Sequence, residues 1–160
     1  VTDGLPALAL GTDPNAEDVL ERGPRGRDES VIEPRTMTSV FTIGMTLTAL
    51  GLLLFFFALQ ETTSPVLAQT LLFTFIVTVE MLVIQVIRMR FDQPLLSNPW
   101  LVAAVAVSFG LQLVVLYSPL HRAFDVTPLS VTGWTWIGVA AAVFLVMNLA
   151  FERVAERLVE

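Results

Sequence analysis

Four long runs of apolar residues dominate the chain, and short polar segments separate them. A soluble amphipathic helix keeps one face polar, but these runs have almost no polar stripe. About 20 mostly apolar residues are what an α-helix needs to cross the hydrocarbon core of a bilayer. The pattern therefore predicts four transmembrane helices, at about residues 36–59, 66–87, 99–118 and 134–151.

The first 35 residues do not follow this pattern. The apolar stretch Leu5–Leu10 is short, contains Pro6 and has Asp3 instead of a basic region before it, so we do not expect a cleavable signal peptide. Residues 13–35 are rich in Asp, Glu, Arg, Pro and Gly, a composition that cannot bury a core of its own. We expect a loop there.

Composition agrees with a membrane protein, because 54% of the 160 residues are hydrophobic and only 15% are charged. The chain has no cysteine and one histidine, which excludes disulfides, thiolate nucleophiles and histidine clusters. Its formal net charge of −6 leaves no basic surface, so a nucleic-acid partner is not expected. The expected partner is the lipid bilayer.

The arginines indicate an orientation, since basic residues concentrate on cytoplasmic loops. Eight of the nine fall on one side of the predicted spans, and Arg122 is the exception. Both ends of the chain are therefore expected in the cytoplasm. The eight are Arg22, Arg25, Arg27 and Arg35 before the first span, Arg88 and Arg90 after the second, and Arg153 and Arg157 after the fourth.

Small and hydroxyl residues recur at helical spacing in three spans. We interpret these seams as helix-packing faces, with a transport path or a dimer face as alternatives. They are Thr38, Thr42, Gly44 and Thr46 in the first span, Ala104, Ser108 and Gln112 in the third, and Gly138 and Ala142 in the fourth. Aromatic residues near span ends, Trp100, Tyr117, Trp134 and Trp136, are interpreted as interfacial anchors.

Two positions have side chains suited to ion chemistry. Glu80 is the acid well inside a predicted span, where an ionised carboxylate needs a partner or water. Its neighbours along the helix are apolar, so another helix must supply a partner, or the carboxyl stays protonated. We favour an ion or proton pathway over a carboxyl that only orients helices. Thr2 and Asp3 are oxygen donors that suit a hard cation, although Asp before a short helix is more often an N-terminal cap.

Several motifs together resemble one family. Thr2-Asp3-Gly4-Leu5-Pro6-Ala7, Asp13-Pro14 and Asp18-Val19-Leu20-Glu21-Arg22-Gly23-Pro24-Arg25 resemble the end of the sixth transmembrane helix and the following cytoplasmic loop of calcium-pump-type P-type cation ATPases. The likeness continues in Glu80-Met81, Asn98-Pro99-Trp100-Leu101, Leu116-Tyr117 and Val126-Thr127-Pro128-Leu129-Ser130. It covers essentially the whole chain. Gly23 departs from it, because relatives commonly have proline there.

The resemblance implies an all-α membrane protein with four transmembrane helices, an N-terminal half-helix and a cytoplasmic loop. Residues 1–12 would be the end of a helix that carries ion ligands, residues 13–35 the loop, and residues 36–160 the four-helix region with a short cytoplasmic tail. It implies that Thr2, Asp3 and Glu80 bind the transported metal cation, with Ca²⁺ preferred. Asp18, Arg22 and Arg25 would couple phosphorylation to helix movement, with topology and solvation alone as the alternative for the arginines.

The sequence has no Asp-Lys-Thr-Gly-Thr phosphorylation motif and no lysine, so we expect no catalysis and no bound cofactor in this chain alone. In the intact pump, Mg-ATP would act on other domains. The implied partners are the remaining helices and the cytoplasmic domains of the pump, in the plasma membrane. The alternatives are a free-standing four-span protein, either a proton-coupled exporter using Glu80 or a non-catalytic accessory subunit, and a truncated pump remnant that transports nothing.

Overall fold

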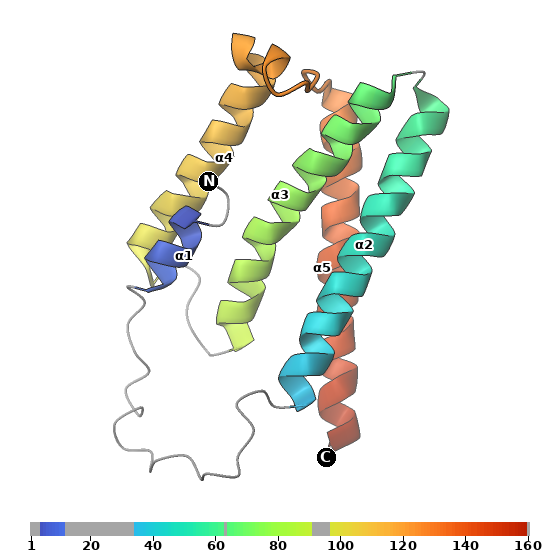
Figure 1. The fold of residues 1–160 in the computed structure, drawn as a ribbon. Coiled ribbons are helices and arrows are strands. Elements are labelled where there is room, and N and C mark those ends of the chain that lie inside the picture. Colours follow the sequence, from blue (N-terminus) through green and yellow to red (C-terminus); the bar gives the residue numbers. More distant parts are fainter. Residues whose placement is uncertain (1–3, 12–33, 63, 91–96, 160) are drawn as a thin grey trace.

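The computed structural model describes residues 4–11, 34–62, 64–90 and 97–159, and among these residues it contains helices and short connections without strands. Four of the helices are long and apolar enough to cross a membrane. The predicted fold class, four such helices preceded by a short N-terminal helix, is confirmed. The elements are α1 (Gly4–Leu10), α2 (Pro34–Glu61), α3 (Pro65–Arg90), α4 (Pro99–Tyr117), the 3-10 helix η1 (Pro119–Arg122) and α5 (Val131–Val159) (Figure 1).

Proline marks where three of the long helices begin. Pro34, Pro65 and Pro99 are the first residues of α2, α3 and α4. Proline suits this position because the first backbone N–H groups of a helix have no partner within the helix. At α4 the cap is complete, since the Asn98 side chain accepts a hydrogen bond from the backbone N–H of Leu101 at 3.0 Å. These starts are local features that the sequence itself specifies.

The helices alternate in direction, and α3 lies at the centre of the arrangement (Figure 1). Helix α3 contacts α2, α4 and α5, while the short α1 packs on α4. In the most apolar 18-residue stretch of α3, 44% of the residues are buried. The corresponding share is 22% in α4 and in α5, and 17% in α2. Most residues of the outer helices are therefore not fully buried by the described part of the chain, as expected for helices that face lipid or further helices.

An apolar core joins α2, α3 and α5. Its buried members are Leu54, Ala58, Ala68, Leu71, Phe75, Val79, Leu116, Leu129, Ile137, Ala141 and Phe144. Gly51 lies close to a side chain of α3, because a Cβ added there would be 3.0 Å from the Leu72 Cδ1 atom. Small residues let neighbouring helices pack closely in this way. The core forms a three-helix unit along most of the bundle.

Hydrogen bonds organise the connection between α4 and α5 at the upper end of Figure 1. The Tyr117 hydroxyl donates to the Leu129 carbonyl oxygen at 2.7 Å and accepts from the Trp134 indole N–H at 2.7 Å. The backbone N–H of Thr127 donates to the Thr70 hydroxyl oxygen on α3 at 3.0 Å. The connection is thus tied both to itself and to α3. The proposed role of these aromatic residues as interfacial anchors stays a prediction.

The predicted small-residue seams differ in where they lie. Nothing lies within 4 Å of a Cβ added at Gly44 or Gly138, so these two glycines face open space in the described part of the chain. Ser108 and Gln112, in contrast, are buried on α4. Within the described residues, the seam of the third span is therefore a packing face, whereas those glycines are not at a helix contact.

Candidate functional site

One of the predicted site residues, Glu80, lies in the described part of the chain. It is near the middle of α3, about 15 Å from Arg90 at 1.5 Å of rise per residue. Its side chain is half-buried, and the residue takes part in an interaction with another group. The other predicted residues, which are Thr2, Asp3, Asp18, Arg22 and Arg25, lie outside the described residues.

The polar side chains buried between α3 and α4 were only partly anticipated. The Gln112 Nε2 group on α4 donates to the Thr74 hydroxyl oxygen on α3 at 3.2 Å. Ser108, one turn before Gln112, is buried, and neither its Oγ atom nor the Gln85 Oε1 atom has a hydrogen-bond partner among the described residues. Buried polar atoms are nearly always paired in folded proteins. Ser108 Oγ and Gln85 Oε1 are thus buried polar atoms that the described residues leave unsatisfied.

A second polar cluster lies where α1 ends, α3 ends and α4 begins, at the lower end of Figure 1. The Asn98 side chain donates from Nδ2 to the Ala9 carbonyl oxygen at 3.0 Å, which joins α4 to α1. The Arg88 guanidinium on α3 donates to the Ser97 hydroxyl oxygen at 2.8 Å. Asn98 and Arg88 are only 2% and 3% exposed. Sequence reasoning used Asn98 only as part of a motif and did not assign it this contact.

No group of three His, Cys, Asp or Glu residues that could hold a metal ion occurs in the described ranges 4–11, 34–62, 64–90 and 97–159. Thr2 and Asp3 fall outside those ranges, so the predicted cation site of Thr2, Asp3 and Glu80 stays a prediction.

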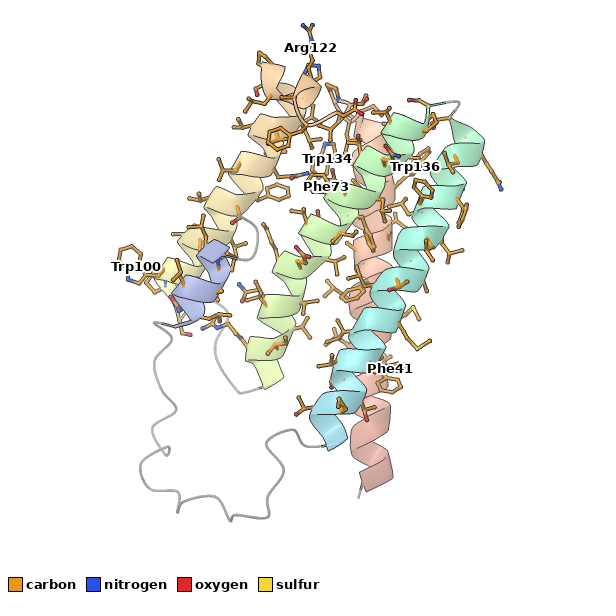
Figure 2. The ribbon with its side chains drawn as sticks, viewed as in Figure 1. Phe41, Phe73, Trp100, Arg122, Trp134 and Trp136 are labelled. Carbon is orange, nitrogen blue, oxygen red and sulfur yellow. The ribbon has the colours of Figure 1, made fainter. Side chains whose placement is uncertain are left out.

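The side-chain view shows aromatic residues on the outer surface, with Trp100 and Phe41 pointing away from the bundle (Figure 2). Such surfaces are suited to contact with lipid or with other membrane helices.

Four apolar helices long enough to span a bilayer, with amides and hydroxyls buried between them, define an integral membrane protein. The sequence model of one family, described as the C-terminus of cation transporting ATPases, matches residues 1–154. The chain therefore belongs to the C-terminal membrane region of the P-type cation-transporting ATPases, which confirms the resemblance of its motifs.

Individual relatives agree with this assignment. A calcium-transporting ATPase of Bacillus subtilis (strain 168) is 31% identical over 139 residues, which cover 84% of this chain and 16% of the relative. Endoplasmic reticulum-type calcium-transporting ATPase 3 of Arabidopsis thaliana is 31% identical over an alignment of 169 positions. That alignment covers 84% of this chain and 17% of the relative. Calcium-transporting ATPase 4 of the same type and organism is 26% identical over 194 residues. The chain spans about a sixth of the length of these relatives.

Proposed function

We propose that this chain is the C-terminal membrane region of an ATP-driven calcium pump. In this role the four-helix region (α2 to α5) braces the transport helices, while Thr2, Asp3 and Glu80 supply part of the cation site. The family match over residues 1–154 is the observation that carries the proposal. Calcium is proposed as the transported ion because the relatives described above are named calcium-transporting ATPases.

The position of Glu80 supports its proposed role as a ligand. An acid near the middle of a membrane-spanning helix is costly and is typically functional. The residues three and four positions away on α3 are all apolar: Ile76, Val77, Val83 and Ile84. A cation held jointly with oxygen ligands from a neighbouring helix would offset the cost of the charge, and carboxylate oxygens are ligands that Ca²⁺ prefers.

Glu80→Gln in the full-length pump tests this role. We expect weaker calcium-dependent phosphorylation from ATP, because the neutral amide loses the charge that attracts the ion. Phosphorylation from inorganic phosphate without calcium should remain largely intact, since that reaction does not need an occupied site. Calcium titrations of phosphoenzyme formation make the measurement. An unchanged calcium dependence would remove Glu80 from the cation site.

We also propose that Asp18, Arg22 and Arg25 belong to a cytoplasmic loop that couples phosphorylation to helix movement. Arg22→Ala combined with Arg25→Ala should slow the transition that follows phosphorylation, while equilibrium calcium affinity stays the same. Rapid-mixing kinetics and equilibrium calcium binding separate these quantities. Loss of membrane insertion without a kinetic effect would instead assign the arginines to topology alone.

The proposed setting is the plasma membrane with both ends of the chain in the cytoplasm, as the arginine distribution indicates. Mg-ATP and the phosphorylation, nucleotide-binding and actuator domains would be contributed by the remainder of the pump. A free-standing exporter or accessory protein is not favoured, because the family match extends over nearly every residue of the chain.

A further inference from the structure

We infer that Asn98 is a positioning residue that holds the end of α1 in place against α4, and that calcium binding by the proposed ligands depends on this contact. The inference rests on the proposed function, because it concerns how the segment that carries Thr2 and Asp3 is fixed. It adds a residue to which neither the motif resemblance nor the relatives assign a role. The observation that carries it is the buried hydrogen bond between Asn98 and Ala9.

Helix α1 ends at an external contact of this kind. Its packing partner is α4, against which Pro6 and Ala9 are buried. The carbonyl groups in the last turn of a helix have no partner within the helix. Ala9 lies in that last turn, and its carbonyl oxygen is the group that accepts from Asn98 Nδ2 at 3.0 Å.

Asn98 is itself held rigidly, so it can fix the position of α1. Its backbone is extended and its Oδ1 atom accepts from the Leu101 N–H at 3.0 Å, which makes it the N-terminal cap of α4. One side chain therefore uses its oxygen to begin α4 and its nitrogen to hold α1. Pro99 directly after it starts the helix, and the neighbouring Ser97 hydroxyl receives a hydrogen bond from buried Arg88 of α3.

The place of this contact in the sequence gives it a functional meaning. Thr2 and Asp3 directly precede α1, and the proposed coupling loop with Asp18, Arg22 and Arg25 follows it. Along the sequence, Ala9 thus lies between the proposed ion ligands and the loop through which phosphorylation would act. If α1 loses this contact, its orientation becomes less defined, and the calcium affinity of the ligands before it should fall.

Two variants separate the two roles of the Asn98 side chain. Asn98→Asp and Asn98→Ser both keep an oxygen that can cap α4, because Asp and Ser are good N-terminal caps, but both remove the nitrogen that donates to Ala9. In the full-length pump, we expect either variant to raise the calcium concentration for half-maximal phosphorylation about three- to five-fold, the factor for losing one net hydrogen bond. The maximal phosphoenzyme level and phosphorylation from inorganic phosphate should be kept.

Asn148→Ser is the matched control. Asn148 is also an asparagine that is only 2% exposed, but its Nδ2 group donates to the Phe144 carbonyl oxygen of its own helix α5 at 2.8 Å. Its replacement should leave the calcium dependence unchanged. A shift in the Asn98 variants that Asn148→Ser does not reproduce supports the positioning role.

Four outcomes would overturn the inference. The first is an unchanged calcium dependence in both Asn98→Asp and Asn98→Ser. The second is a shift seen only in Asn98→Ala, a further variant that loses the α4 cap as well. In both cases the proposed function stands. An equal shift in Asn148→Ser would assign the effect to general destabilisation. Absence of calcium-dependent phosphorylation in the unchanged pump would instead refute the proposed function, and the inference with it.

Discussion

Helices α2, α3 and α5 are joined by an apolar core, whereas hydrogen bonds from buried side chains join α4 to α3 and to α1. The apolar core takes most of its side chains from α2, α3 and α5, and of the described residues of α4 it includes Leu116 alone. On the other side, the Gln112–Thr74 and Asn98–Ala9 hydrogen bonds join α4 to α3 and to α1. Helices α2, α3 and α5 thus form a packed unit, whereas α1 and α4 form the side of the bundle with these specific hydrogen bonds.

The difference has a physical reason. In a bilayer, lipid chains are as apolar as leucine, so helix contacts are stabilised by close packing and hydrogen bonding and gain little from removing apolar surface from lipid. A tightly packed core with glycine at a close approach therefore suits a unit that stays together. Hydrogen bonds between single side chains fix a geometry without a large packed surface. They suit a helix whose orientation must be defined, which is what we infer for α1 and its contact with Asn98.

The largest expected effect is the loss of a core aromatic residue. Phe75 on α3 is fully buried, and Phe75→Ala would leave a cavity among α2, α3 and α5. We expect the free energy of unfolding to fall by about 3 kcal/mol, at the low end for aromatic truncations because the transfer term is small in lipid. Denaturant titration in detergent micelles, followed by circular dichroism, makes the measurement.

Phe73→Ala is the control for this prediction, because Phe73 is on the same helix but 44% exposed (Figure 2). It should change the free energy of unfolding much less. Equal losses in the two variants would show that the α2–α3–α5 core does not dominate stability, and the contrast between the two sides of the chain would not hold.

Much of the fold could be predicted because length and apolarity decide it locally. A run of about 20 apolar residues specifies a spanning helix, and a proline such as Pro65 or Pro99 indicates where one begins. The ends of helices are less predictable, because α5 continues beyond its membrane-spanning part, which ends at Phe151, to Val159. Glycines show the same limit: Gly51 makes a close contact and Gly44 does not, a difference that depends on which face meets another helix.

The candidate site was predictable only where one residue is informative alone. Glu80 is identifiable because an acid inside an apolar span is costly wherever it faces. Asn98 is different, because the cap is a local pattern but its second partner, Ala9, is 89 positions away in the sequence. Gln112 was placed correctly on a polar seam of its helix, yet nothing in the sequence indicated Thr74 as its partner. Contacts between distant segments require the three-dimensional arrangement.

A smaller effect is expected at the polar contact between α3 and α4. A double-mutant cycle with Gln112→Leu and Thr74→Val should give a coupling free energy of about 0.6 kcal/mol, up to about 1.7 kcal/mol, the range for hydrogen bonds between membrane helices. Unfolding titrations of the single and double variants supply the four values. The coupling is small because helices separated in the membrane find other partners for the same polar groups.

Pairing Gln112→Leu with Thr78→Val is the matched cycle. Thr78 is one turn along α3, and its hydroxyl donates to the Thr74 carbonyl oxygen of its own helix at 2.8 Å. Its coupling to Gln112 should therefore be close to zero. If both cycles gave the same value, the Gln112–Thr74 hydrogen bond would not be what joins α4 to α3. Apolar contact would then account for both sides of the chain, and the polar attachment of α4 would have no energetic basis.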